Sequence, residues 1–410
     1  MNYRIWYSAE AFANFIIDNT KLIKKNFVKK RMYESDANNA NNFHSMPDHI
    51  KKILYLDAPD IIVEIDHEPI FSVEISTEAG TGHNAFQRFA RLAASVENNV
   101  PAIYIYPEAV IVSRQGCQDR WDKINPLIFK ALDDVMSIHG IPALMYYYPS
   151  NYRNYMDATT IPNKSNKGLL PNSNRNYSGS PTSNDPEMSS MFNTMNEIID
   201  IFEKHGIIKG REKLLANRLV IARRTLMIQE FIKKGGHLKM SPLSATINIP
   251  TQYLLNYLSK YENSKYSIGE LLRSRTMTVI YKANATFRSD PYPGALVAID
   301  YLLCREGKSF EERKYNLVLA WSDIYVDHAN QTIKPLGTKG KIKDFTNAVQ
   351  ASEDSNILSK EYKDIPNHQI PRYYMQVRYG STYSKAKHIR VISYFADAML
   401  FPDGALWRDG

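Results

Sequence analysis

The chain is poor in cysteine and has no long apolar run. Among its 410 residues, Cys117 and Cys304 are the only cysteines. Two cysteines are too few for a cysteine zinc cluster, and their separation does not suggest a redox pair. We therefore expect a reducing compartment. No segment approaches the roughly 18–20 apolar residues of a membrane helix, and the first residues lack the apolar core of a signal peptide. These absences predict a soluble, cytoplasmic protein with no membrane partner.

Apolar residues are nevertheless abundant enough for well-packed cores. Hydrophobic residues make up 44% of the chain and aromatic residues 11%, which excludes wholesale disorder. At roughly 100–200 residues per domain, the length predicts two or three domains.

Charge is divided along the chain. The net charge is only +8, yet residues 53–135 hold 13 acidic and six basic residues, whereas residues 205–285 hold 14 basic and four acidic ones. The basic segment predicts a helical region that binds an anionic partner such as DNA. The alternative is a set of helices with solvated basic side chains. The candidate DNA-binding cations are Arg218, Arg223, Arg224, Lys233, Lys234 and Lys239.

Hydrophobic periodicity predicts an α/β domain in the first part of the chain, over residues 1–155. The expected elements are helices at 8–31, 46–55, 84–98 and 121–138, a hairpin at 61–65 and 70–76, and strands at 100–106 and 143–148. Residues 156–190 are rich in Asn, Ser and Pro and predict a flexible linker. A basic helical DNA-binding region is expected at 191–285, followed by an α+β region at 286–410 that would recognise DNA.

Two carboxylates stand at corresponding places in the predicted hairpin. Pro59-Asp60 opens its first strand, and Glu74-Ile75-Ser76 ends its second. Asp60 and Glu74 are separated by 14 positions, and side chains alternate between the two faces of a strand. Both carboxylates can share a face only if the pairing is centred on His67 or contains a β-bulge. We predict one of these two arrangements.

This series of hairpin, glycine break, helix and buried strand resembles the PD-(D/E)xK nuclease superfamily, the fold of most Type II restriction endonucleases. The resemblance covers residues 45–148. It implies an αβββαβ core, a mixed sheet flanked by helices. It also implies that Asp60, Glu74 and the backbone carbonyl of Ile75 hold Mg²⁺. In that family a lysine two residues after the glutamate assists the attacking water, and Ser76 stands in its place.

Ser76 departs from the family pattern because it carries no charge. A lysine could reach the site from elsewhere, and Lys51 and Lys52 are candidates. If the strand continues, the side chain of Glu78 faces the same side as that of Glu74 and could join the catalytic group. Glu64 is expected in a second tier or in solvent. The histidines show no ligand spacing and are expected to be structural or superficial.

The helix after the glycine break carries a polar group. Gln87 and Arg91 are one turn apart, with Arg88 between them. Either these side chains contact DNA phosphates or orient Glu74, or the helix is a surface helix with salt bridges.

The resemblance implies a Mg²⁺-dependent endonuclease that hydrolyses double-stranded DNA, in the manner of a sequence-specific Type II restriction enzyme. A homodimer would match a palindromic site, and a cognate DNA methyltransferase could belong to the same system. The alternatives are a repair, phage or mobile-element nuclease of the same fold, or a DNA-binding protein on a decayed nuclease scaffold.

Overall fold

The chain forms two compact units in the computed structural model. Unit 1 comprises Met1–Tyr33, Met46–Ile50 and Ala58–Leu238, and unit 2 comprises Glu34–Ser45, Lys51–Asp57 and Lys239–Gly410. The structure describes residues 1–33, 42–43, 45–54, 56–113, 116–155, 161, 164–262, 267–283, 291–337, 340–342, 344 and 387–407.

Unit 1 is built on a mixed sheet with the strand order β2-β1-β3-β4-β5-β8. Strands β1, β3 and β4 pair antiparallel, whereas β2 runs parallel to β1, and β5 and β8 run parallel to β4. The central strands are apolar on both faces, as expected for a sheet covered on both sides. The strand bounds are β1 Tyr3–Tyr7, β2 Phe27–Arg31, β3 Ile61–Ile65, β4 Glu68–Ile75, β5 Ala102–Pro107 and β8 Ala143–Tyr148.

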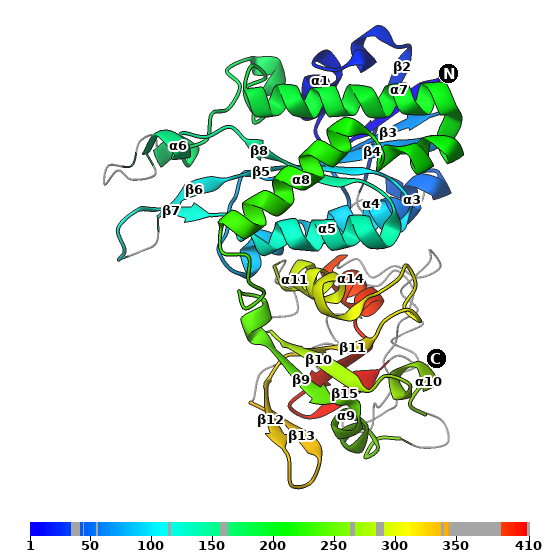
Figure 1. The fold of residues 1–410 in the computed structure, drawn as a ribbon, viewed down its shortest axis with the longest axis vertical. Helices are drawn as coiled ribbons and strands as arrows, with labels where there is room; N and C mark the ends of the chain where they lie inside the picture. The colour runs from blue at the N-terminus through cyan, green and yellow to red at the C-terminus, as the bar shows by residue number, and fades with distance from the viewer. Residues whose placement is uncertain are drawn as a thin grey trace. The chain divides into compact units, whose positions relative to one another are not determined.

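Helices cover both faces of this sheet (Figure 1). One layer contains α1 (Glu10–Asp18) and the long α7 (Pro186–Leu214), which is joined to β8 by a hydrogen bond from the Tyr146 hydroxyl to Thr194. The other contains α4 (Phe89–Glu97) and α5 (Leu127–His139), and α8 (Arg218–Lys233) packs along α5. Smaller elements are η1 (Lys21–Lys24), α3 (Asp48–Leu54), η2 (His83–Phe86), the hairpin β6 (Ala109–Val112) and β7 (Arg120–Lys123), α6 (Tyr152–Tyr155), η3 (Lys164–Asn166) and η4 (Arg175–Tyr177).

Unit 2 has its own mixed sheet, with the order β15-β14-β11-β10-β9. Across the described residues of both units, the structure contains no helix with the length and hydrophobicity needed to span a bilayer. The elements of unit 2 are η5 (Leu243–Ala245), β9 (Thr246–Pro250), α9 (Thr251–Leu258), α10 (Glu270–Arg273), β10 (Met277–Lys282), α11 (Pro291–Ile299), the π-helix η6 (Asp300–Cys304), β11 (Tyr315–Ala320), the hairpin β12 (Asp323–Asp327) and β13 (Thr332–Leu336), α14 (Lys387–Phe395), β14 (Ala398–Phe401) and β15 (Gly404–Trp407).

The predicted α/β class is confirmed, but the predicted division of the chain differs from the observed units. Unit 1 continues past residue 155 to Leu238, so α7 and α8 pack with the first sheet and the expected 191–285 region is divided. The predicted linker at 156–190 also packs in its described part. Leu169 is buried and bridges Ser150, and Pro171 bridges Pro181. Its Asn, Ser and Pro content therefore reflects turns rather than a flexible connection.

Two segments that were predicted to be helical contain a strand at one end. The segment 8–31 is helical only at Glu10–Asp18 and, as a 3₁₀ turn, at Lys21–Lys24, and Phe27–Arg31 pairs with β1 at the sheet edge. The predicted helix at 121–138 begins at Leu127, because Arg120–Lys123 pairs with β6. Short edge strands rich in Lys and Arg lack the apolar alternation that reveals a strand in sequence.

The core of unit 2 contains a cluster of buried charges. Asp300 pairs with Arg305 at 2.9 Å and with Arg313 at 2.7 Å, and all three side chains are fully buried. Asp397 pairs with Arg313 at 3.1 Å and with Arg275 at 3.3 Å. The cluster ties the π-helix to the segments just before β11 and β14, so removing one partner would leave a buried charge unpaired.

Asp300→Ala should lower the free energy of unfolding by about 3–5 kcal/mol, because it leaves two guanidinium groups buried without their carboxylate. The measurement is urea unfolding followed by circular dichroism. The matched control is Glu306→Ala, which removes an exposed carboxylate 3.7 Å from Lys314 and should cost less than about 0.5 kcal/mol. Equal effects of the two substitutions would contradict the structural role of Asp300.

Candidate functional site

The hairpin of β3 and β4 contains a bulge that fixes which side chains face one another. Its turn is Asp66-His67, with φ values of 48° and 71°, as a tight two-residue turn of type I′ requires. Next to the turn, Glu64 pairs with Pro69, but Val63 pairs with Phe71. Ile70 is therefore the extra residue of a bulge in β4.

The bulge places Asp60 opposite Glu74. Beyond it, Ile61 pairs with Val73, and continuing that register brings the two carboxylates onto one face of the sheet. The prediction of a bulge or a His67-centred pairing is thus confirmed. The backbone N–H of Ile75 donates to Asp60 Oδ2 at 2.9 Å, and the hydroxyl of Ser8 donates to Oδ1 at 3.1 Å. These bonds hold Asp60 against the end of β4.

Glu74 is buried in an ion pair with α4. Arg91 Nη1 donates to both carboxylate oxygens, at 2.8 and 3.0 Å. The same nitrogen lies 3.9 Å from Asp60 Oδ1, and Arg88 Nε lies 3.7 Å from Glu74 Oε1. Burial raises the pKa of Glu74 well above its usual value, and the charge of Asp60 raises it further, while the two arginines oppose this shift. The carboxylates and guanidinium groups form a compact group of four charges, the four-charge cluster.

Two buried tyrosines lie beside this cluster. Tyr104 of β5 pairs in register with Glu74, and its ring lies 5.2 Å from that of Tyr106. Burial raises the pKa of Tyr104, and the nearby Glu74 charge contributes to the rise. Neither phenol hydroxyl has a hydrogen-bond partner among the described residues. Buried polar atoms are nearly always paired with protein groups, water or ligand, so these hydroxyls indicate a place for a polar ligand or its water.

The residues present fit a hard divalent cation. Mg²⁺ takes oxygen ligands and usually keeps several waters. Asp60 and Glu74 offer carboxylate oxygens from adjacent strands, and the unpaired phenols could bond to metal-bound water. The position between the carboxylates is held in this structure by the guanidinium of Arg91, so a cation would bind Glu74 only after that side chain moves.

Ser76 and Glu78 do not complete a catalytic group. Ser76 is buried, and its hydroxyl bonds to the backbone of Glu78 in a local turn. Glu78 is exposed and pairs with Lys167 at 3.0 Å. The expected substitute lysines, Lys51 and Lys52, fall in unit 2, whereas Asp60 and Glu74 fall in unit 1. Lys167 was missed by sequence reasoning because it lies 91 residues beyond Ser76.

The candidate DNA-binding cations fall into two groups. Arg223 is buried, pairs with Glu187 and stacks over Tyr146, so its expected DNA contact is corrected to a structural role. Arg224 bonds to Asp133 of α5 at 2.6 Å, and Lys234 lies 3.5 Å from Glu108. The side chains of Arg218, Lys233 and Lys239 are exposed, and Gln87 is half-buried at the end of η2.

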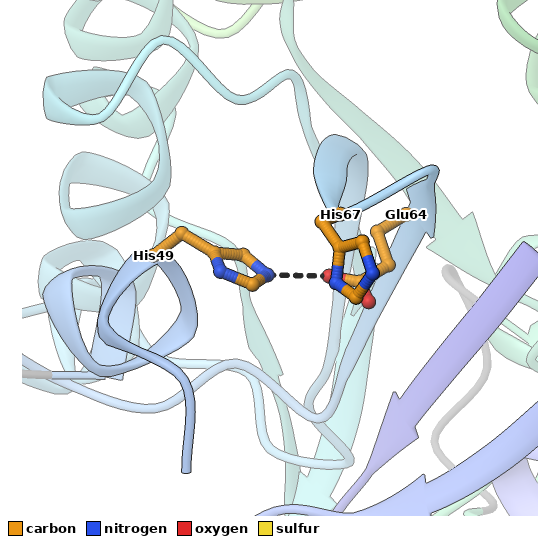
Figure 2. Close-up of side chains that lie close together, drawn as sticks. All are labelled: His49, Glu64 and His67. Atoms are coloured by element: carbon orange, nitrogen blue, oxygen red, sulfur yellow. Dashed lines mark hydrogen bonds and ion pairs between the residues drawn. The ribbon is translucent and has the colours of Figure 1, made fainter.

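A second charged group lies at the turn end of the same hairpin, where Figure 2 shows His49, Glu64 and His67 together. Glu64 is buried and accepts from His49 Nε2 at 2.8 Å and from Arg4 Nη1 at 2.7 Å. The three side chains could hold a metal ion, but Arg4 Nη1 also lies 3.2 Å from His67 Nδ1. Arg4 therefore links Glu64 to His67, and His49 bonds to the other oxygen of Glu64, so the three side chains belong to one hydrogen-bonded group.

This arrangement bears on two expectations from the sequence, a second-tier or solvent position for Glu64 and a structural or superficial role for the histidines. Glu64 does not lie in solvent, and His49 and His67 are brought together by α3 and the hairpin turn over a separation of 18 residues. No spacing rule covers such a distance.

Searches of protein-family models, of curated proteins and of solved structures find no match to this chain.

The contribution of Glu74 to the stability of metal-free protein should fall as the pH rises above 4.5, the usual pKa of a glutamate. Because the pKa of Glu74 is raised in the folded state, its contribution is complete below the unfolded pKa and is lost as the pH passes the folded pKa. Each unit of raised pKa corresponds to about 1.4 kcal/mol. Glu74→Gln should remove this loss, as measured by urea unfolding in EDTA at about pH 5 and about pH 8.

The matched control is Glu10→Gln, which alters an exposed carboxylate paired with Lys29 and should follow the wild-type profile. If the free energy of unfolding depends on pH in the same way in Glu74→Gln and in wild type, the raised pKa of Glu74 in the folded protein is contradicted.

Proposed function

We propose that the chain is a Mg²⁺-dependent deoxyribonuclease of the PD-(D/E)xK type. The observation that carries the proposal is the bulged hairpin, which brings Asp60 and Glu74 onto one sheet face at the end of β4. A bulge next to an active site is a common way of aiming a side chain. In an ordinary surface hairpin the two carboxylates would not need this register.

The topology around the hairpin supports the same proposal. Antiparallel neighbours β1, β3 and β4 are followed by α4 and then by β5, parallel to β4. This order corresponds to the βββαβ part of the expected restriction-endonuclease-like core, with α1, β2 and α3 inserted between β1 and β3.

The chemistry assigns each group a role. Asp60, Glu74 and the carbonyl of Ile75 would hold Mg²⁺, which when bound polarises a phosphoryl oxygen and lowers the pKa of a bound water. Arg88 is partly exposed beside Glu74 and would contact the phosphate. Ser8 and the Ile75 N–H orient Asp60.

The proposed substrate is double-stranded DNA, cleaved in the manner of a Type II restriction enzyme. The exposed Arg218, Lys233 and Lys239 would contribute to phosphate binding, and unit 2 to recognition of the target sequence. A homodimer and a cognate methyltransferase belong to the same proposal. A nuclease of repair, phage or mobile-element origin with this fold would use the same site.

A second candidate is a non-catalytic DNA-binding protein on the same scaffold. Ser76 favours it, since this residue supplies no charge and its hydroxyl is engaged in a turn with Glu78. The two candidates differ in whether DNA is cut, not in whether it is bound.

The test is nicking of supercoiled plasmid with Mg²⁺. Wild type should convert plasmid to nicked or linear DNA, and Asp60→Asn and Glu74→Gln should each reduce the rate by at least about a hundredfold, as expected for loss of a group that stabilises the transition state. Matched controls are Asp200→Asn and Glu10→Gln, which change exposed carboxylates paired with Lys21 and Lys29 and should keep wild-type rates.

Cleavage that persists in both site variants would refute the assignment of Asp60 and Glu74. Binding of a labelled duplex without cleavage of plasmid or genomic DNA of varied sequence would favour the non-catalytic candidate.

A further inference from the structure

Arg91 occupies the place where a metal ion would bind in the proposed nuclease site. Its Nη1 atom is within hydrogen-bond distance of both Glu74 oxygens and lies 3.9 Å from Asp60. A cation bound jointly by the two carboxylates would need that same space. The guanidinium nitrogen and the metal ion are therefore mutually exclusive partners of Glu74.

The charge balance of the four-charge cluster shows what would displace Arg91. Asp60 and Glu74 carry two negative charges, and Arg88 and Arg91 carry two positive ones. A divalent cation alone would leave an excess of two positive charges in a largely buried group, which is costly. A cation that arrives with DNA phosphates restores the balance, because the phosphates can pair with the released guanidinium groups.

The backbone of α4 is held against the sheet by hydrogen bonds that do not involve the Arg91 side chain. Ser95, one turn after Arg91, accepts a hydrogen bond from Ser72 of β4 at 2.7 Å and donates to the Arg91 carbonyl at 3.3 Å. These buried bonds fix the backbone of α4 against the sheet. Arg88 is more exposed than Arg91, with 30% and 8% of their side-chain surfaces accessible, so a phosphate meets Arg88 first.

We propose that Arg91 is a latch on the metal site: it holds Glu74 in the DNA-free protein and moves to a phosphate when DNA binds, so that the divalent cation enters. The inference rests on the proposed function. It makes metal binding and DNA binding mutually dependent, because each partner must raise the affinity for the other by the same factor. In the absence of DNA, the latch keeps the metal site closed.

The first experiment measures Mn²⁺ binding to DNA-free full-length protein by titration calorimetry at about pH 8, several units above the ordinary pKa of a carboxyl group. Arg91→Gln should bind Mn²⁺ about tenfold tighter than wild type or more, within the range typical of coupled sites. Arg88→Gln is the matched control, since it removes the same charge near the same carboxylate but does not free the position between Asp60 and Glu74. It should give a much smaller gain.

Two double variants locate the bound ion. Arg91→Gln with Glu74→Gln should lose the gain, and Arg91→Gln with His67→Ala should keep it, which separates this site from the His49, Glu64 and His67 group. If Arg91→Gln does not fold by circular dichroism, Arg91→Met places an unbranched apolar side chain in the buried position and tests the same point. An equal gain from Arg88→Gln, no gain from Arg91→Gln, or a gain independent of Glu74 overturns the latch.

The second experiment measures binding of a fluorescein-labelled 30-base-pair duplex by anisotropy, with Ca²⁺ or with EDTA at constant ionic strength. Ca²⁺ should strengthen DNA binding by wild type and by Arg88→Gln, and much less by Arg91→Gln. An equal Ca²⁺ effect in wild type and Arg91→Gln overturns the coupling. Neither experiment depends on cleavage, so the latch can stand if plasmid nicking fails and can fail if plasmid nicking succeeds.

Discussion

One extra residue in β4 determines the arrangement of the candidate site. Without Ile70 as the bulged residue, the register set by the Asp66-His67 turn would continue along the hairpin and turn Asp60 and Glu74 to opposite faces of the sheet. The turn and the carboxylates make different demands on register. A two-residue turn without a bulge places Asp60 and Glu74 on opposite faces of the sheet, whereas a shared site needs them on one face. The bulge meets both demands. Because of the bulge, Arg91 can hydrogen-bond to Glu74 and lie 3.9 Å from Asp60 at the same time.

The sequence predicted the hairpin and the strands β5 and β8, because these follow from local patterns of apolar residues, and the even separation of Asp60 and Glu74 could be read from it directly. It also narrowed the hairpin to two registers. It could not choose between them, since the turn conformation depends on Asp66 and His67 adopting positive φ, which non-glycine residues seldom do.

Long-range contacts were beyond sequence reasoning. The pairing of Arg4 with Glu64 joins residues 60 positions apart, and Tyr104 faces Glu74 through a parallel register set by the α4 crossover. For Arg223 the sequence led to a wrong prediction. Its place in a basic segment suggested a surface cation, but Val220, Met227 and Phe231 are buried beside it on α8, and the helix turns Arg223 inward with them. Charge counted along a chain does not distinguish cations that balance buried carboxylates from cations that remain exposed.

The same sheet face carries two buried carboxylates, and each is balanced by arginine in a different way. Glu64 of β3 lies four residues after Asp60, which precedes the strand, about 13 Å along the chain. Glu64 is held by Arg4 from a neighbouring strand and by His49, so its partners belong to the sheet and to α3. Glu74 is held from α4, whose Arg88 and Arg91 supply the positive charge that Ser76 lacks. Ser76, which follows β4, carries no charge, so the positive charge beside Glu74 comes from the helix, and a guanidinium group can form paired hydrogen bonds with a carboxylate or with a phosphate. In the proposed site, the uncharged Ser76 and the arginines of α4 are therefore two aspects of one arrangement, in which the cation beside Glu74 would exchange its carboxylate for a phosphate.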